Sequence, residues 1–426
     1  MAFDGSRRLV VLGFGAIGAG LFVYEAQRTG DYAPPLVVDV RPELVAALRA
    51  ADGRVRLNIA QADGVEMVEL GPLEVADSTV AAERVRIIEA IAAADELASA
   101  LPSVGLYRSD APNSPHLLLA EGLRRRAGTE PLIVLCAENH RSAAALLEGA
   151  VQEAVPAGER EVLAGRSCWV DTVIGKMSGV ISDPAELRAL HLSTITPSLP
   201  AAFLVEAFDH ILVSRVDPSG RSHPGMPVLR EVDDLAPFED AKLLGHNATH
   251  ALGAFVGELL DLTLFADLSQ TDGAMPFLRA AFIEESGAAV CRRWAGADGL
   301  FTAAGWEAFA DDLLARMVNP WLADTIERAA RDPRRKLGWD DRLVGLIRLG
   351  LAQGVPTPSY AMGAAAGLDV LRRDAAVHGS DADLLRGCWP DGLAPDEVDA
   401  VLAAVSEGRE RLARWTAGGF PALAAV

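Results

Sequence analysis

A glycine-rich turn between a predicted strand and a predicted helix constrains the fold more than any other feature. The turn follows the apolar segment 8–12, precedes a helical pattern that runs to about residue 28, and reads Gly13-Phe14-Gly15-Ala16-Ile17-Gly18. The first glycine permits a tight turn, the second lets the backbone approach a pyrophosphate, and the third lets the helix pack on the strand. This order of elements predicts a dinucleotide-binding α/β fold, whereas a glycine-rich packing turn is the plainer alternative.

An aspartate at the end of the next predicted strand supports the first interpretation. Asp39 closes the apolar run that begins at Leu36 and lies 21 residues after Gly18. A carboxylate at this place binds the hydroxyls of the adenosine ribose and repels a 2′-phosphate, which favours NAD. Arg41 weakens that preference, so NADP is the less favoured alternative. The predicted cofactor-binding residues are Gly13, Phe14, Gly15, Ala16, Ile17, Gly18, Asp39 and Arg41.

The pattern of the chain changes near residue 238, which indicates two domains. Before that point strand and helix patterns alternate, and the near-continuous apolar run at 131–136 is typical of a parallel sheet covered on both faces. A single strand is expected over 202–213. Beyond 238 the patterns are helical, over 238–266, 275–290, 303–330, 340–353, 359–374 and 395–416. We predict a Rossmann-like doubly wound α/β domain with β insertions over 1–238 and an all-helical substrate-binding domain over 239–426.

Lysine is scarce in this chain, which has three lysines and 36 arginines. Arginine is permanently protonated and cannot act as a base, whereas a lysine can when burial or a nearby cation lowers its pKa. Lys242 stands in the polar segment Lys242-Leu-Leu-Gly-His246-Asn247-Ala-Thr-His250 and is the first candidate for a catalytic base. Chance placement of a rare residue is the alternative. Lys176 is expected to be an ordinary surface or loop lysine.

On a regular helix, Lys242, Asn247 and His250 would fall within an arc of roughly 140°. The apolar residues of the segment would cluster on the opposite side. A lysine, an amide and an imidazole on one face suit alcohol oxidation, because a hydroxyl must lose its proton as its carbon loses hydride. His246 and His250 also have the spacing of zinc ligands, but no third ligand lies nearby, so no metal site is predicted.

Composition excludes several classes of function. The net charge of −20 repels nucleic acids and anionic membranes, so we predict neither as a partner. The four cysteines are far apart in sequence and are expected to be buried or free thiols in a reducing, cytoplasmic compartment. Arg7, Arg8 and the uncharged run after them imitate an export signal. The glycines within that run and the missing cleavage site argue against export.

Several motifs together resemble the polyol-specific long-chain dehydrogenases, a family that includes mannitol dehydrogenases, mannitol-1-phosphate 5-dehydrogenases and uronate reductases. The family signature of lysine, four residues, asparagine, two residues and histidine is present at Lys242, Asn247 and His250. The further motifs that carry the resemblance are Ala137-Glu138-Asn139, Val170-Asp171, Arg331-Asp332-Pro333-Arg334-Arg335-Lys336-Leu337 and Asp341-Arg342-Leu343.

The resemblance implies a role for each matching residue. Lys242 would be the general base, Asn139 and Asn247 would stabilise the developing oxyanion, and His250 would orient substrate hydroxyls. Asp171 would position the substrate or tune the lysine. The family needs no zinc.

The chain departs from the family pattern at Ala16, Ala19, Thr172 and the residues after Asn139, which puts the substrate in doubt. A basic cluster could clamp a sugar phosphate, or it could equally form a structural ion-pair network. Its members are Arg331, Arg334, Arg335 and Lys336.

These features predict a zinc-independent, NAD-dependent oxidoreductase that interconverts a sugar alcohol, or its phosphate, and the matching ketose. Mannitol 1-phosphate and fructose 6-phosphate are the first candidates. Free mannitol and substrates of the tagaturonate or fructuronate reductase type follow. A β-hydroxyacid dehydrogenase is disfavoured by its tighter lysine-to-asparagine spacing. A non-catalytic NAD-sensing protein is the alternative from another class.

Overall fold

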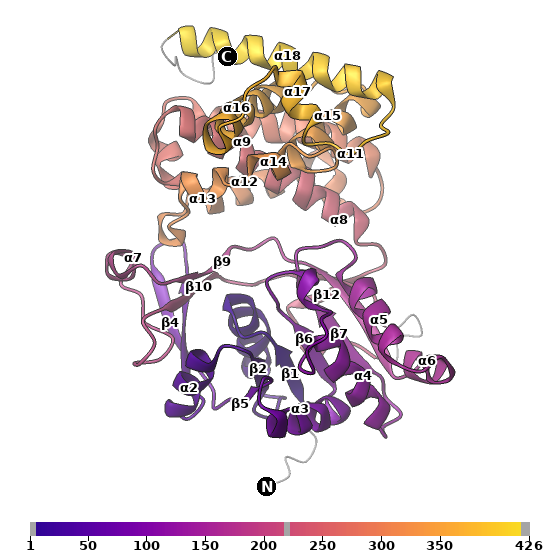
Figure 1. Cartoon of the computed structure of the whole chain (residues 1–426). Coiled ribbons are helices and arrows are strands. Elements are labelled where there is room, and N and C mark those ends of the chain that lie inside the picture. The colour runs from indigo at the N-terminus through magenta and orange to yellow at the C-terminus, as the bar shows by residue number, and fades with distance from the viewer. Residues whose placement is uncertain (1–5, 217–221, 419–426) are drawn as a thin grey trace. The chain divides into compact units, whose positions relative to one another are not determined.

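The computed structural model describes residues 6–216 and 222–418, and it divides into two compact units, Met1–Ala236 and Pro237–Val426 (Figure 1). Unit 1 mixes strands and helices, whereas unit 2 is helical. This is the predicted fold class, a Rossmann-like α/β domain followed by an all-helical one. None of the helices in the described parts of the chain is both long enough and apolar enough to cross a membrane.

The main sheet of unit 1 has eight strands in the order β12-β11-β8-β7-β6-β1-β2-β5. Neighbouring strands are parallel except for β11, which runs antiparallel to β8. Six neighbouring strands of this sheet, in the order β8-β7-β6-β1-β2-β5, are all parallel. They have the doubly wound arrangement, with the crossover between β1 and β6. The strands are β1 (Leu9–Leu12), β2 (Leu36–Asp39), β5 (Glu74–Asp77), β6 (Glu96–Ser99), β7 (Leu132–Cys136), β8 (Ser167–Val173), β11 (Ile211–Ser214) and β12 (Leu229–Val232).

Each face of this sheet has its own hydrophobic core, because successive side chains of a strand point to opposite faces. In β1, Leu9 and Val11 belong to one core, whereas Val10 and Leu12 belong to the other. The second core is closed by three helices that pack against one another in sequence order, α3 (Ala81–Ala93), α4 (Pro115–Arg125) and α5 (Ala143–Ala154). The first core contains the helical segment that follows β1, made of the π-helix η1 (Gly18–Val23) and α1 (Tyr24–Thr29).

A second sheet of four strands packs on the first core, in the order β4-β3-β10-β9. Its strands are β3 (Val55–Ala60), β4 (Val65–Leu70), β9 (Ser178–Ile181) and β10 (Ala202–Glu206). The expectation of one strand over 202–213 is therefore wrong. The chain leaves β10 after Glu206 and enters β11 at Ile211, and these two strands belong to different sheets. Shorter helices complete the unit, namely α2 (Pro42–Ala50), α6 (Arg160–Ala164) and α7 (Pro184–Ala189).

Unit 2 is built around one helix, α9 (Asn247–Leu259), whose middle is fully buried. Around it pack α13 (Ile326–Ala330), α15 (Arg342–Gln353) and α16 (Pro358–Ala375), and α18 (Pro395–Ala417) lies along α16 (Figure 1). The other helices are α8 (Ala236–Asp240), α10 (Ala274–Ala280), α11 (Ala288–Arg293), α12 (Ala303–Met317), α14 (Pro333–Lys336) and α17 (Asp381–Arg386).

Two of the predicted helices of unit 2 contain π-helical turns. The predicted helix over 238–266 carries η4 (Ala241–His246), and that over 275–290 carries η6 (Ala281–Gly287). The predicted helix over 303–330 is broken between α12 and α13, where Asn319 caps a short turn that begins at Pro320. Proline lacks an amide hydrogen and clashes with the preceding turn, so the break follows from the sequence at this position.

Candidate active site

The glycine-rich turn after β1 has the geometry that a dinucleotide requires. Gly13 has a φ of 86°, and a Cβ there would lie 2.7 Å from the carbonyl oxygen of Ala100. A Cβ at Gly18 would lie 2.6 Å from the carbonyl oxygen of Gly13, so the helix packs closely on the turn. At Gly15 a Cβ would meet nothing within 4 Å. The open space at Gly15 fits the close approach of a pyrophosphate to the backbone.

Asp39 is buried beside this turn and binds both its backbone and Arg41. Asp39 Oδ2 accepts a hydrogen bond from the amide of Phe14 at 2.9 Å. The Arg41 Nη2 group donates to Asp39 Oδ2 at 2.8 Å and to the carbonyl oxygen of Phe14 at 2.9 Å. Burial raises the pKa of Asp39, but the hydrogen bonds from Arg41 and Phe14 outweigh it, so the pKa lies below its ordinary value. Asp39 is therefore an anion at neutral pH, and it forms an ion pair with the half-exposed side chain of Arg41.

Two further predicted residues lie at the carboxyl ends of neighbouring parallel strands. Asn139 is exposed after β7, and Asp171 in β8 is paired in register with Cys136 at the end of β7. Asp171 Oδ1 accepts the amide of Ala144 at 2.8 Å, in the first turn of α5. Burial raises the pKa of Asp171, and its bonds to the α5 amides oppose that shift. The carboxylate of Asp171 thus caps α5 from outside the helix.

Glu138, which sequence reasoning gave no role, is a buried anchor beside Asn139. Its Oε1 accepts hydrogen bonds from Ser99 Oγ at 2.6 Å and from the amide of Leu101 at 2.8 Å, and its Oε2 accepts one from the hydroxyl of Tyr107. These bonds join the end of β7 to the segment after β6, which also lies against Gly13. Glu138 therefore ties the strand end that carries Asn139 to the glycine turn.

In unit 2, Lys242 lies within the π-helix η4 rather than in a regular α-helix. The amide of Asn247 donates to the carbonyl oxygen of Lys242, an i to i+5 bond. Residues five apart thus lie one turn apart, so the spacing of lysine and asparagine in the signature matches one π turn. His250 follows Asn247 by three residues in α9, which places it on the same side. The prediction of a regular helix at this position is wrong, and the π turn aligns the three polar residues more closely.

The charge state of Lys242 is shifted by its surroundings. Burial lowers the pKa of Lys242 to about 8, Arg342 lowers it further, and Glu239 opposes them. Burial also lowers the pKa of His246 well below its ordinary value, and the neighbouring side chains of His250, Arg316, Lys242 and Arg342 act in the same direction. Lys242 can therefore be neutral near physiological pH, as a base must be.

His250 is held in one orientation by a buried carboxylate. Its Nε2 lies 2.7 Å from Asp324 Oδ2, and its ring stacks on Phe265 with centroids 4.4 Å apart. Asp324 also accepts a hydrogen bond from Arg328 Nε at 2.9 Å. Burial raises the pKa of Asp324, but His250 and Arg328 outweigh this and lower it below its usual value. With Nε2 engaged, Nδ1 is the ring nitrogen of His250 that can face a substrate.

The π turn is supported by the neighbouring segment η6. Because a π turn alters the regular hydrogen bonding of a helix, a carbonyl oxygen in it can accept a hydrogen bond from a neighbouring segment. Here the hydroxyl of Ser286 donates to the carbonyl oxygen of Leu244 at 2.9 Å. The two segments approach closely at Gly245, where a Cβ would lie 3.0 Å from Phe282 Cε2. These contacts hold the local geometry that presents Lys242.

The predicted basic cluster makes internal contacts. Lys336 is buried, and its Nζ donates to the carbonyl oxygen of Arg331. Burial, Arg342 and Arg335 lower the pKa of Lys336 to about 8. Arg334 donates to the carbonyl oxygen of Gly387 at 2.6 Å, and Arg335 pairs with Asp332 at 3.0 Å. These contacts resemble the ion-pair alternative more than a phosphate clamp.

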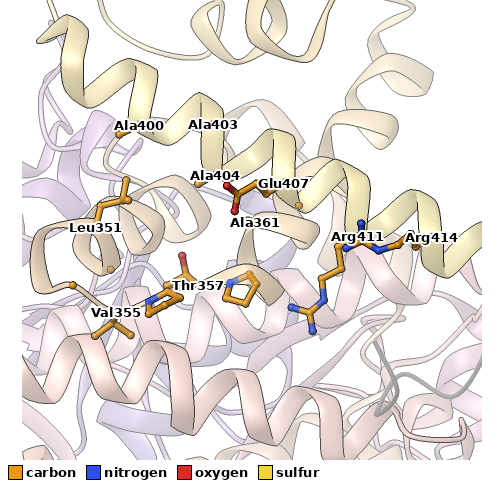
Figure 2. A pocket seen from close by; sticks show the side chains of 15 residues that line it. Leu351, Val355, Thr357, Ala361, Ala400, Ala403, Ala404, Glu407, Arg411 and Arg414 are labelled. Atoms are coloured by element: carbon orange, nitrogen blue, oxygen red, sulfur yellow. The ribbon is translucent and has the colours of Figure 1, made fainter.

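Two other observations bear on the predicted sites. Within residues 6–216 and 222–418, no group of three or more metal-binding side chains is arranged to hold a metal ion. Lys176 lies in a loop, as predicted, and its Nζ pairs with the exposed carboxylate of Asp209 at 3.0 Å. A cavity of about 790 Å³ lies between the α15–α16 connection and α18, and it contains none of the predicted catalytic or cofactor-binding residues (Figure 2).

Comparison with known proteins agrees with this geometry. Residues 7–217 match the mannitol dehydrogenase Rossmann domain, and residues 234–378 match the mannitol dehydrogenase C-terminal domain. The chain belongs to the mannitol dehydrogenase family. The first match contains the glycine turn, Asp39, Asn139 and Asp171, and the second contains Lys242 and the rest of its signature.

Solved structures of two polyol dehydrogenases share the fold. A D-sorbitol dehydrogenase in its substrate-free form has a TM-score of 0.78 at 14% identity, over 99% of this chain and 95% of that one. The mannitol 2-dehydrogenase of Pseudomonas fluorescens, in a ternary complex with NAD and D-mannitol, has a TM-score of 0.69 at 16% identity, over 99% and 94%. At such identities the likeness establishes the fold alone.

Sequence reasoning missed three residues that the structure places in or beside the predicted sites of this mannitol dehydrogenase family member. Glu138 and Arg342 belong to motifs that were recognised, but nothing in a single sequence distinguishes a buried charge from an exposed one. Asp324 lies 74 residues after His250, in the break between α12 and α13, within the segment that was predicted as one helix over 303–330. Its pairing with His250 depends on how α13 packs against α9.

Proposed function

We propose that this protein is an NAD-dependent dehydrogenase that interconverts a secondary alcohol of a polyol, or of a polyol phosphate, and the corresponding ketone. The observation that carries the proposal is a lysine with a pKa of about 8, aligned by a π turn with Asn247 and His250. Membership of the mannitol dehydrogenase family supports it. The pair of mannitol 1-phosphate and fructose 6-phosphate is the first to test.

In the oxidation, neutral Lys242 accepts the proton of the substrate hydroxyl at its Nζ. Asn247 donates amide hydrogens to the oxygen as negative charge develops on it. His250, held through Nε2 by Asp324, orients a substrate hydroxyl through Nδ1. When bound beside the glycine turn, NAD would supply the hydride-acceptor chemistry that oxidation of the carbinol carbon needs. The products are the ketone, NADH and one proton, which Lys242 releases to solvent before the next turnover.

The residues of the glycine turn fit the cofactor. Gly13, Gly15 and Gly18 supply the turn, the open approach and the close helix packing, and Asp39 supplies an anion for the ribose hydroxyls. The anionic state of Asp39 favours NAD over NADP. The role proposed for Asp171 differs from the one that the family resemblance implies, because its carboxylate accepts a hydrogen bond from the first turn of α5. We propose that Asp171 positions the segment that carries Asn139.

A panel of substrates tests the proposal. NADH absorbance is followed with hexitols, hexitol phosphates and hexonates at alkaline pH, and ketose reduction is followed near neutral pH. Turnover of at least one polyol class in both directions is the expected result. NAD binding without any turnover across the panel would overturn the proposal and favour an NAD-sensing protein.

A further inference from the structure

Arg342 is a buried cation whose hydrogen-bonding capacity is only partly used. The residue is 8% exposed and begins α15. Its Nε donates to Asp341 Oδ1 at 2.7 Å, and the same oxygen accepts the Arg342 amide. Within residues 6–216 and 222–418, its side chain makes no other hydrogen bond or ion pair. Both Nη groups are thus left without a protein acceptor.

The Nη groups of Arg342 reach accessible space. Among the described residues, the indole nitrogen of Trp169 is the only fully buried side-chain polar atom without a hydrogen-bond partner. The Arg342 nitrogens therefore are not sealed inside the protein. Asp341 fixes the guanidinium by its Nε side, and the opposite edge is free to bind two oxygen atoms of one planar or tetrahedral anion.

Arg342 also lies beside the predicted catalytic lysine. The helix α15 packs against η4, and a Cβ at Gly345, one turn after Arg342, would lie 3.4 Å from Leu244 Cδ2. The guanidinium is close enough to Lys242, His246 and Lys336 to lower the pKa of each. In a protein with a net charge of −20, this group gathers positive charge around the lysine.

Burying positive charge without a full set of partners is costly, so an anion that completes the site is expected to be bound strongly. The members of the predicted basic cluster are less suited to this role. Arg334, Arg335 and Lys336 already bind protein oxygens, as described above. Arg342 alone combines deep burial with an unused pair of nitrogens beside Lys242.

We propose that Arg342 determines substrate specificity by binding a phosphate or carboxylate group of the polyol through its free guanidinium edge. This inference rests on the proposed function and deepens it, because it assigns the enzyme to anionic rather than neutral polyols. The shared chemistry is an oxyanion with at least two oxygens, and a hexitol phosphate and a hexonate are its two sources.

The test compares kcat/KM for D-mannitol, D-mannitol 1-phosphate and D-mannonate in the wild type, Arg342→Gln, Arg342→Lys and Arg279→Gln. The assay is run at about pH 9, above the pKa of Lys242, so that the base is mostly neutral. The wild type should prefer one anionic substrate to mannitol by at least roughly tenfold, and Arg342→Gln should lose that preference. Arg342→Lys should retain part of it, because lysine keeps the charge but not the fork.

Arg279→Gln is the matched control, since it removes one exposed cation of unit 2 that pairs with Asp311 and Glu307. It should leave the preference unchanged. The ratio between substrates is the readout, because a change in Lys242 caused by losing Arg342 affects all three alike. A wild type that prefers mannitol, or an Arg342→Gln enzyme that loses activity equally on every substrate, would overturn the inference.

A binding measurement separates this inference from the proposed function. Inorganic phosphate should raise the unfolding temperature of the wild type and of Arg279→Gln, but not that of Arg342→Gln. If no polyol is turned over and phosphate still discriminates these proteins, the proposed function fails while the anion site stands. Equal stabilisation of all three proteins, or of none, contradicts the anion site.

Discussion

At the scale of single residues, the proposed chemistry depends on groups whose charge states are set by their surroundings. Lys242, Asp39 and Asp324 all have shifted pKa values, and each shift has an identified structural cause. The residue types could be predicted from the sequence, since the signature and the glycine turn name Lys242, Asn247, His250 and Asp39. The residues that contact or shift them could not be predicted, because Arg342 comes near Lys242, and Asp324 near His250, only through the packing of separate helices.

The pKa of Lys242 predicts a pH dependence. Below about pH 8 the lysine is protonated and cannot accept the hydroxyl proton, so kcat/KM for polyol oxidation should rise with pH and level off above that value. Ketose reduction needs the protonated lysine and should decline above the same pH. His246, with a pKa far below its ordinary value, stays neutral in this range and adds no step. Initial rates over the pH range check this, and an oxidation rate that is flat or falls with pH would contradict it.

The pairing of Asp39 with Arg41 predicts how cofactor preference can be changed. In Asp39→Ser, the anion that repels a 2′-phosphate is lost and Arg41 is released, so the NADP to NAD ratio of kcat/KM should rise by roughly tenfold or more. Steady-state kinetics with both cofactors measure the ratio. In the control Asp39→Ser/Arg41→Gln the gain in NADP use should disappear. An equal gain in both variants would show that Arg41 plays no part.

Asp324 is predicted to act through His250. Asp324→Asn should lower kcat/KM for the polyol by roughly 10- to 100-fold, because the hydrogen bond that orients the imidazole loses its charged acceptor. In a His250→Ala background the same change should have little further effect. Steady-state kinetics of the wild type, Asp324→Asn, His250→Ala and the double variant form a double-mutant cycle that measures this coupling. Additive losses would mean that Asp324 supports the fold without positioning His250.

At the scale of elements, regular strands and helices follow from the sequence pattern, whereas irregular ones depend on partners. The apolar run at β7 and the helical patterns of α15, α16 and α18 correspond closely to the structure. The π turn η4 was not foreseen, because its hydrogen-bond partner Ser286 comes from 42 residues further along the chain. The division of 202–213 into β10 and β11, which belong to different sheets, also depends on tertiary contacts. The apolar pattern of the sequence continues across this segment and does not show the break.

The packing of α18 on α16 gives a prediction at this scale. A Cβ at Gly408 would lie 2.3 Å from the carbonyl carbon of Ala361, so Gly408→Ala should destabilise unit 2 by about 1–3 kcal/mol or more. Gly149→Ala in α5 is the contrast, because a Cβ there meets nothing within 4 Å. It should stabilise unit 1 by up to about 1 kcal/mol through helix propensity. Denaturant unfolding measures both, and a tolerated Gly408→Ala would contradict the close packing.

At the scale of the whole molecule, the predicted functional residues are distributed over two units with separate cores. The glycine turn and Asp39 lie in unit 1, whereas Lys242, Asn247 and His250 lie in unit 2. The alternation of patterns before residue 238 and the helical patterns after it were enough to predict these two fold classes. The second sheet of unit 1 could not be foreseen, since its strands come from two distant segments of the chain.

Because the predicted cofactor-binding residues and the proposed base lie in different units, losing the base should not abolish cofactor binding. In Lys242→Met, a side chain of similar length and without a titratable group replaces the lysine. The most direct measurement therefore compares wild type and Lys242→Met for NAD-dependent thermal stabilisation and for turnover of the best polyol. We predict equal stabilisation by NAD, and oxidation about 10²- to 10⁴-fold slower in the variant. A Lys242→Met protein that binds NAD and still turns over polyol at the wild-type rate would contradict the central claim.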